Sequence, residues 1–427
     1  METKVFKFGG ASVKDADGIR NVAEIIQANA LPVGQVIVVS AMGKTTNALE
    51  NLLKQALDGL DYSDDFNLLS SSHYRTAEEL FPDTYESEQV KTGLKCHFDA
   101  LFLYLSKAAQ EDRDCIYDQV VSLGEFLSSW LLFQYLSKCG YPVSLLDAPS
   151  IIRTSDNWRE GEVDMEQSAF LMEEKLLPLL KAGNVLTQGF LGGTPEGMRT
   201  TLGREGSDYT AALIAYFLEA ESVSIWKDVP GVLSADPAWK ADAVLLPELS
   251  YQDAAELTYY GATVIHPKTI RPLARKKIPL FVRSFLDSQL PGTLVGPEGK
   301  KLKQESWIRK RNQVLVSLSS RDFSFMEEKN IRELLQAFSD AGLSMQMLQV
   351  SATSISVVTD GQERRLEKVL AEISGAYSVL FNHNLTLITV LNPGSMAMDF
   401  RLNGSMPFLL QKTRSSLQML FLENDAD

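Results

Sequence analysis

The N-terminal part of the chain alternates short apolar strands with amphipathic helices, and this alternation restricts the fold more than any other feature. Residues 4–8 (KVFKF) and 35–39 (QVIVV) have the length and composition of buried strands. Between them, apolar residues recur at helical spacing from Ile19 to Ile26, and a second helix is expected at 46–57. Because strands that alternate with helices form parallel sheets, the sequence predicts an α/β fold with a mainly parallel sheet.

The middle of the chain continues this pattern. Residues 61–118 are predicted to be mostly helical, followed by a helix at about 119–138 and strands within 142–146, 184–193 and 221–232. The last two strands run into turns that are rich in glycine or proline.

A segment rich in glycine and proline, LPGTLVGPEGKK (290–301), precedes a region with a different pattern. This region predicts strands at 314–319, 345–350, 354–358 and 377–381 and helices at 328–341 and 363–374. The resulting order β-α-β-β-α-β is that of a ferredoxin-like unit. A further strand at 385–391 begins a second unit that the chain has little room to finish.

The stretch Gly43-Lys44-Thr45-Thr46 follows a predicted strand and resembles the end of a Walker A phosphate loop. A complete loop has a further glycine, separated by four residues from the Gly-Lys-Thr, so that its backbone N–H groups surround a phosphate. Val38 occupies that position. If the chain binds a nucleotide, another loop must therefore hold the phosphates.

Composition excludes several classes of function. The chain has 427 residues, is 45% hydrophobic and 22% charged, and carries a formal net charge of −14. The acidic balance opposes nucleic acid as a partner, because phosphate backbones need basic surfaces. No apolar stretch reaches the roughly 20 residues of a membrane span. No signal peptide is recognisable either, so we expect a cytoplasmic protein.

Cysteine and histidine offer no catalytic or metal pattern. Cys96, Cys115 and Cys139 are widely spaced and are expected to be reduced thiols in the core. The four histidines show no spacing of metal ligands, so we predict no metal site made by protein side chains alone.

Three segments combine glycine with reactive side chains. KFGGAS begins at Lys7, TLGREGSDYTAA contains Arg204 and Asp208, and KDVPGVLSADP spans 227–237. Glycines between a strand and a helix let backbone N–H groups approach an anion. Each segment also has a plain structural explanation, namely a tight turn, a helix N-cap or a surface turn. Glu125 interrupts an apolar helix, and a carboxylate buried there needs a cationic partner.

Together, the segments KFGGASV, SAMGKTTN, SLGEFLS, TQGF, GREGSDYTAA, WKDVPGV…DP and YGATVIHPKT resemble, in this order, the aspartate kinases of the amino-acid-kinase superfamily. The resemblance covers 4–290, and the remaining chain resembles the tandem ACT domains of that family. It implies an amino-acid-kinase-like, mainly parallel sheet sandwiched by helices over 1–295, a linker over 296–312, and ACT regulatory and dimerisation units over 313–427, the second of them shortened.

The implied reaction transfers a phosphoryl group from ATP, with Mg²⁺, to the side-chain carboxylate of L-aspartate. Its product is 4-phospho-L-aspartate, the first intermediate in the biosynthesis of lysine, threonine and methionine. The acceptor carboxylate is already ionised at pH 7, so no general base is needed and catalysis rests on positioning and charge stabilisation.

The resemblance also implies roles for individual residues. Lys7 stabilises the transferring phosphoryl group, and Asp208 organises the phosphoryl end together with Mg²⁺. Arg204 holds the α-carboxylate of aspartate and Glu125 its α-ammonium group. The other residues implied to face aspartate are Ser40, Thr46 and Ser207. Those implied to line the nucleotide, besides Lys7, are Gly9, Gly10, Ser12, Lys227, Asp228 and Leu233.

Two positions depart from the family pattern. The family commonly has Lys where Thr263 stands and Arg where Ala238 stands, and both usual residues are cations near the nucleotide. Lys227, Lys240 and Lys268 are the candidates to replace that charge.

Two other functions remain possible from the sequence. One is a kinase of the same superfamily that acts on glutamate, which the Arg204–Glu125 pair and the ACT-like tail disfavour. The other is a catalytically weak amino-acid sensor, which the presence of Lys7, Glu125, Arg204 and Asp208 disfavours. The shortened tail predicts a homodimer, because its second sheet lacks a closing helix and needs other cover. The turn at 319–328 lacks glycine, so we expect weak or no inhibition by lysine or threonine.

Overall fold

The computed structural model describes residues 2–31, 33–262, 264–297, 299, 302–322, 324–373, 375, 377–394 and 404–423. The chain divides into two compact units. The first comprises Met1–Val232, Leu245–Ala255 and Val264–Lys301, and the second comprises Leu233–Val244, Glu256–Thr263 and Leu302–Asp427. The second unit therefore includes two segments from the region that the sequence analysis placed in the catalytic domain.

The first unit is built on an eight-stranded sheet in the order β3-β4-β2-β1-β7-β9-β10-β8. Its strands are β1 (Lys4–Phe8), β2 (Gln35–Val39), β3 (Val143–Leu146), β4 (Asn184–Gln188), β7 (Ser222–Lys227), β8 (Glu248–Ser250), β9 (Leu280–Ser284) and β10 (Thr293–Gly296). All neighbouring pairs are parallel except β9 with β10. The predicted α/β sheet is confirmed, and β1 and β2 have the predicted bounds.

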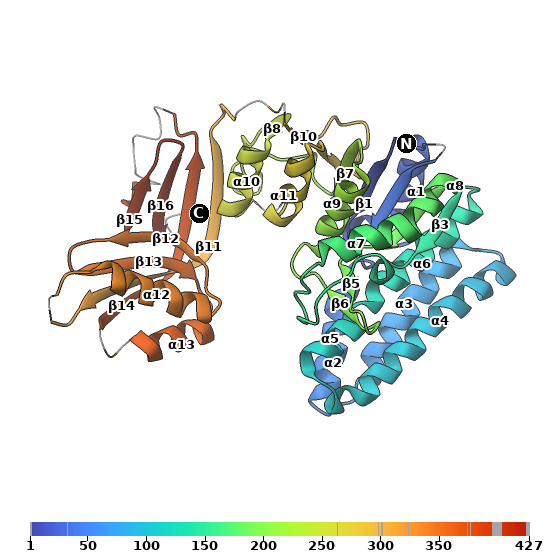
Figure 1. Cartoon of the computed structure of the whole chain (residues 1–427), viewed down its shortest axis with the longest axis horizontal. Coiled ribbons are helices and arrows are strands. Elements are labelled where there is room, and N and C mark those ends of the chain that lie inside the picture. Colours follow the sequence, from blue (N-terminus) through green and yellow to red (C-terminus); the bar gives the residue numbers. More distant parts are fainter. Residues whose placement is uncertain are drawn as a thin grey trace. The chain divides into compact units, whose positions relative to one another are not determined.

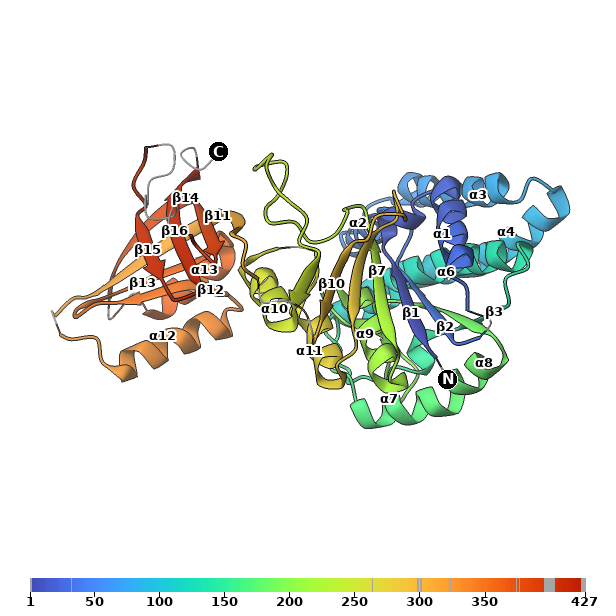
Figure 2. The same ribbon diagram turned by 90° about the horizontal axis from the view of Figure 1, so that it is seen from above.

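Helices cover both faces of this sheet (Figures 1 and 2). The helices α9 (Gly206–Leu218) and α11 (Pro267–Lys276) pack on each other on one side, with α7 (Met165–Leu171) and α8 (Leu177–Ala182) nearby. On the other side lie α1 (Ala16–Ala28), α2 (Thr45–Leu57), α3 (Ser63–Leu80), α4 (Thr84–Lys107) and α6 (Leu123–Lys138). Helix α5 (Arg113–Val121) packs against α2 and α4. The single helix predicted at about 119–138 is wrong at its start, because α5 ends at Val121 and α6 begins at Leu123.

The centre of the first unit is apolar and tightly packed. Phe8 and Trp226 are fully buried on neighbouring strands, and their rings stack with centroids 5.9 Å apart and planes inclined by 7°. Such a buried aromatic pair fixes the register of β1 against β7, because a slip of either strand by one residue would turn its ring to the opposite face of the sheet. This register places Lys7 beside Ile225, near the carboxyl ends of both strands.

The second unit is a six-stranded antiparallel sheet in the order β12-β13-β11-β14-β16-β15. Its elements are β11 (Ser306–Ser320), α12 (Glu328–Asp340), β12 (Met345–Val350), β13 (Ser354–Asp360), α13 (Glu363–Ile373), β14 (Tyr377–Leu391), β15 (Leu409–Lys412) and β16 (Ser416–Leu422). The order β11-α12-β12-β13-α13-β14 confirms the predicted ferredoxin-like unit. Residues 395–403, which belong to the predicted second unit, lie outside the described part of the chain.

Two long strands differ from the prediction. The strands expected separately at 377–381 and 385–391 form one strand, β14, and β11 begins inside the predicted linker. Asn312 and Asn384 each adopt a φ of 55° within these strands, and the register shifts near Asn312. Asparagine tolerates this left-handed conformation, so both strands bend there without ending.

Two expectations from composition concern the cysteines and membrane-spanning segments. Cys96 and Cys139 are exposed and Cys115 is partly exposed, so the expectation that these thiols lie in the core is wrong. Within the described residues, no helix has both the length and the apolar character needed to cross a membrane.

Candidate active site

A cavity of about 580 Å³ opens where β1, β2 and the start of α9 meet. Its lining residues are Lys7, Ser40, Thr46, Asn47, Tyr117, Glu125, Arg159, Phe190, Thr201, Gly203, Arg204, Glu205, Gly206 and Ser207. The structure therefore brings together Lys7 and all five residues that the sequence analysis assigned to aspartate. We call this space the first cavity.

The turn after β1 is held against the turn after β2. A Cβ atom on Gly10 would lie only 2.6 Å from the carbonyl oxygen of Ala41, and the N–H of Gly43 donates to the carbonyl of Gly10 at 3.0 Å. The hydroxyl of Ser12 donates to the carbonyl of Gly9 at 2.6 Å and is fully buried. Gly10 is therefore needed for close approach, and the side chain of Ser12 stabilises the turn that positions Lys7.

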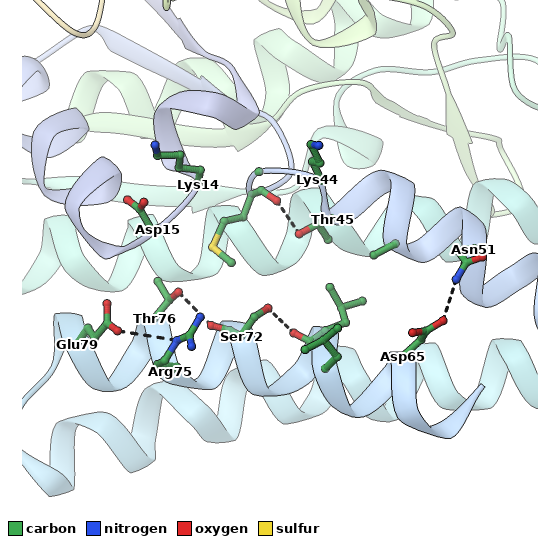
Figure 3. A pocket seen from close by; sticks show the side chains of 15 residues that line it. Lys14, Asp15, Lys44, Thr45, Asn51, Asp65, Ser72, Arg75, Thr76 and Glu79 are labelled. Atoms are coloured by element: carbon green, nitrogen blue, oxygen red, sulfur yellow. Dashed lines mark hydrogen bonds and ion pairs between the residues drawn. The ribbon is translucent and has the colours of Figure 1, made fainter. Parts of the chain in front are cut away.

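The stretch Gly43-Lys44-Thr45-Thr46, which resembles the end of a Walker A loop, separates two cavities. Thr46 faces the first cavity, whereas Lys44 and Thr45 line a second one of about 560 Å³ between this loop, α2 and α3. Figure 3 shows the second cavity, with the side chain of Lys44 directed away from α3. The hydroxyl of Thr45 donates to the carbonyl of Met42 at 2.6 Å. These residues thus shape a loop, and the conclusion that the stretch is no phosphate loop agrees with this geometry.

The start of α9 requires an unusual backbone. Gly203 has a φ of 74° and Glu205 a φ of 55°, and a Cβ atom on Gly206 would lie 2.6 Å from the ring of Phe190. Glycine meets the first and third of these needs without strain, which explains its presence in GREGSD. The turn brings Ser207 and Asp208 into the first turn of α9, where the helix dipole favours negative charge.

A buried ion cluster occupies the floor of the site. The Nζ atom of Lys7 lies 2.6 Å from Oδ1 of Asp208, and the Nζ atom of Lys227 lies 3.2 Å from Oδ2. Asp208 is completely buried. Burial favours its neutral form, but the two ammonium groups outweigh this effect and lower the pKa of Asp208 below its ordinary value. The cluster therefore holds two cations and one anion close to the first cavity.

Glu125 behaves differently from Asp208. Its side chain is 3% exposed, its Oε1 atom accepts from the N–H of Ala41 at 3.2 Å, and its Oε2 atom has no hydrogen-bond partner among the described residues. Burial raises the pKa of Glu125 to about 8. An unsatisfied, buried carboxyl oxygen beside a cavity is suited to a cationic group of a ligand.

This raised pKa predicts a pH effect on stability. A carboxyl group whose pKa is raised on folding stabilises the native state at low pH, and this contribution is lost as pH rises towards about 8. We expect Glu125→Gln, which removes the titration, to abolish part of the loss of thermal stability between about pH 5 and 8. The thermal midpoint of the variant relative to wild type should rise by at least about 2 °C over this range. A constant difference would show that Glu125 does not titrate there.

The residues expected to line the nucleotide fall into separate places. Gly9, Gly10 and Ser12 form the turn after β1, and Lys227 contacts Asp208. Asp228 follows β7 and is exposed, and Leu233 begins a segment of the second unit. Of Lys227, Asp228 and Leu233, the structure therefore connects only Lys227 with the buried ion cluster.

The candidates for the missing cations also differ. Thr263 lies outside the described residues, and Ala238 is exposed. Lys240 pairs with Asp242 at 3.1 Å and lies over the ring of Trp307, so its charge is already partly balanced. Lys268 lines another cavity, of about 470 Å³. Of these three lysines, only Lys227 belongs to the buried ion cluster, through its contact with Asp208.

Sequence reasoning missed several residues of the first cavity: Asn47, Tyr117, Arg159, Phe190, Thr201 and Glu205. Asn47 follows Thr46 and Glu205 follows Arg204, so the sequence could have indicated both. Arg159 and Tyr117 carry no local signal, because only the packing of α5 brings them to the site.

Comparison with known proteins identifies the family of the chain. A model of the amino acid kinase family matches residues 2–284. The lysine-sensitive aspartokinase 3 of Escherichia coli is 32% identical over 403 residues, which cover 91% of this chain and 87% of that protein. The chloroplastic aspartokinase 3 of Arabidopsis thaliana is 30% identical over 458 residues, covering 99% of this chain and 79% of that protein.

A solved aspartokinase structure is also similar to this chain. The structure of E. coli aspartokinase III in complex with aspartate and ADP superposes with a TM-score of 0.85 at 29% identity, and the match covers 100% of this chain and 97% of that one. The matches in sequence extend over both units of the chain, as does the match in structure. This chain therefore belongs to the amino acid kinase family and, within it, to the aspartokinases.

Proposed function

We propose that this protein transfers the terminal phosphoryl group of ATP to the side-chain carboxylate of L-aspartate, as the first step of lysine, threonine and methionine biosynthesis. The observation that carries the proposal is the first cavity, which joins Lys7, Glu125 and Arg204 beside the buried Lys7–Asp208–Lys227 cluster. The related E. coli enzyme has been solved with aspartate and ADP, which supports the same ligands here.

The geometry suits a reaction without a general base. The aspartate side chain is ionised at pH 7 and can attack directly, so the protein must position it and stabilise the charge that develops on the phosphoryl oxygens. Lys7 and Lys227 supply cations that Asp208 holds in place. Arg204 is exposed and forms no ion pair with the described residues, so its guanidinium group is available for the α-carboxylate. Glu125 then receives the α-ammonium group.

Mg²⁺ belongs to the proposal through the nucleotide. Both carboxylate oxygens of Asp208 already contact lysine ammonium groups, and no cluster of three acidic, His or Cys side chains suited to a metal occurs in the described residues. Asp208 therefore does not fit as a direct ligand of the ion. Mg²⁺ commonly retains waters and binds substrate phosphates with few protein ligands, which is the arrangement we infer here. A cytoplasmic location stays a prediction from the sequence.

Arg204 and Glu125 should read the amino-acid backbone of aspartate. We expect Arg204→Ala and Glu125→Ala each to raise the KM for aspartate by about tenfold or more, since each removes a charge-assisted contact. The KM for ATP should stay within about twofold of wild type. Initial rates of ADP release, with Lys44→Ala as a matched control in the second cavity, measure both constants. A change confined to ATP would show that the two residues are misassigned.

The wild-type protein also separates the alternative functions. Aspartate-dependent ADP release, with glutamate as the control substrate, supports the proposal. Release with glutamate alone indicates the other kinase. Absence of release with either, together with aspartate binding, indicates the sensor.

We further infer that the second unit forms a homodimer. The sheet face that was expected to be uncovered is covered within the unit itself, because Leu385 and Leu420 are fully buried there. Other features support pairing: Phe325 and Leu380 are 73% and 68% exposed, and β12 is an edge strand. Exposed apolar side chains and an edge strand favour association with another chain.

Sedimentation tests the dimer. We expect wild type to sediment as a dimer and a chain lacking residues 305–427 to sediment as a monomer, because the deletion removes the inferred interface. Monomeric wild type at micromolar concentration would contradict the inference.

Inhibition is the second test of this unit. In the turn at 319–328, the Oδ1 atom of Asp322 accepts from the hydroxyl of Ser320 and from the N–H of Ser324. We expect activity with millimolar lysine or threonine to stay within about twofold of the control, because this turn lacks the glycine that commonly lets the backbone close on an effector. Strong inhibition by either would show that the unit is a working sensor.

A further inference from the structure

Arg159 lies in the wall of the first cavity, far in sequence from the other charged residues of the site. Its φ is 66°, a left-handed conformation that is uncommon for any residue other than glycine. Such a conformation costs of order 1 kcal/mol and persists only where the surroundings impose it. The position of Arg159 is therefore maintained by specific contacts.

Asp118 provides these contacts from helix α5. Its side chain is fully buried, and its Oδ2 atom accepts from the backbone N–H groups of Arg159 and Thr201, each at 3.0 Å. Its Oδ1 atom accepts from the hydroxyl of Thr201 at 2.8 Å. Thr201 ends β6 (Arg199–Thr201), and the chain then leads directly to Arg204. One buried carboxylate thus holds the loop of Arg159 and the segment that carries Arg204 together.

The side chain of Arg159 is fixed along one side only. Its guanidinium group lies over the ring of Tyr117, 4.1 Å from the centroid, and its Nε atom is 2.6 Å from Oδ1 of Asp114. The hydroxyl of Tyr117 donates to Glu50 at 2.6 Å, which holds the ring in place. The two terminal nitrogens, Nη1 and Nη2, have no hydrogen-bond partner among the described residues. The side chain is 49% exposed, so these donors are accessible.

The charges of the cavity indicate what these donors bind. Arg159 and Arg204 both line it, and their terminal nitrogens have no partner within the described part of the chain, whereas the cation of Lys7 is already paired with Asp208. A carboxylate accepts about four hydrogen bonds, enough for the planar forks of two arginines. The reacting carboxylate of aspartate must face the ion cluster, which leaves the α-carboxylate for the two arginines.

We propose that Arg159 is a specificity-determining residue, whose terminal nitrogens bind the α-carboxylate of the substrate together with Arg204. The inference rests on the proposed function and deepens it. Asp118 acts through Arg159 and Thr201 and is a positioning residue. The site therefore selects an amino acid that carries a free α-carboxylate as well as a reactive side-chain carboxylate.

The test combines a change in the protein with a change in the substrate. We expect Arg159→Gln to raise the KM for aspartate about tenfold, while kcat and the KM for ATP stay within about twofold of wild type. The α-amide of aspartate lacks the negative charge that Arg159 recognises. Its KM should therefore change by less than about twofold between wild type and Arg159→Gln. Arg113→Gln, on the exposed start of α5, is the matched control and should leave all constants unchanged.

Arg159→Gly separates recognition from stability. Glycine adopts the left-handed conformation without strain, and this gain offsets its loss of chain entropy and of the side-chain contacts, so this variant should unfold close to the wild-type temperature. It should nevertheless show the same rise in the KM for aspartate. Unchanged KM values in both variants, with an active wild type, overturn the role of Arg159 alone. An inactive wild type overturns the proposed function instead, and equal losses with aspartate and its α-amide show that Arg159 does not read the α-carboxylate.

Discussion

Replacing Lys7 with alanine should lower kcat for aspartate phosphorylation by about 100-fold or more, corresponding to about 3 kcal/mol of transition-state stabilisation. The ammonium group of Lys7 is buried beside the first cavity, with its Nζ atom 2.6 Å from Asp208. Cations that are fixed before the reaction stabilise developing charge strongly, because no solvent has to reorganise around them. The loss should appear mainly in kcat, since the charge on the phosphoryl group increases in the transition state.

The control for this experiment is Lys44→Ala, since Lys44 is exposed and lines the second cavity. It should keep kcat within about twofold of wild type. Circular dichroism and thermal melting must show that the Lys7→Ala protein is folded. If that folded variant turned over at nearly the wild-type rate, Lys7 would have no role in the chemical step.

Asp208→Asn should have the largest effect on stability, about 3–5 kcal/mol, together with a loss of activity of about 100-fold. The carboxylate is fully buried between the ammonium groups of Lys7 and Lys227. Removing one partner of a buried ionic cluster leaves the remaining charges desolvated and uncompensated, which costs far more than the loss of an exposed ion pair. Urea unfolding followed by circular dichroism measures the difference.

A second variant tests whether the ionic interaction causes this loss. The double variant Lys7→Met/Asp208→Asn should lose clearly less than the sum of the two single variants, because it no longer leaves Lys7 unpaired. Additive losses would show that the two residues stabilise the protein independently.

The pH dependence follows from the lowered pKa of Asp208. A carboxylate whose pKa is lowered on folding stabilises the native state above its ordinary pKa of about 3.9, and this contribution is lost as pH falls through the folded value. The Asn variant should therefore differ most from wild type near neutral pH and least in acid.

Local sequence patterns were sufficient for much of the fold. The strands β1 and β2 and the helix-strand order of the ferredoxin-like unit follow from periodicity within short windows. The continuous strand β14 could not be predicted, because Asn384 reads locally as a turn residue. Pairing with β11, which includes Asn382 before that position and Leu385 after it, keeps the strand intact.

The site shows the same division between local and tertiary information. Lys7, Arg204 and Asp208 stand in glycine-rich turns with recognisable chemistry, so sequence reasoning identified them. The backbone N–H of Arg159 donates to buried Asp118 on helix α5, and this contact holds Arg159 at the cavity. No glycine or charge pattern near Arg159 in the sequence predicts this contact. The left-handed backbone of Arg159 is likewise a consequence of tertiary structure.

The central claim is that the side-chain carboxylate of aspartate becomes an acyl phosphate. Hydroxylamine traps acyl phosphates as hydroxamates, so incubation of the protein with ATP, Mg²⁺, L-aspartate and hydroxylamine tests the claim directly. We predict that the β-hydroxamate of aspartate accumulates in step with ADP, and that glutamate gives neither product. ADP release without the hydroxamate, or hydroxamate formation from glutamate instead of aspartate, would contradict the account.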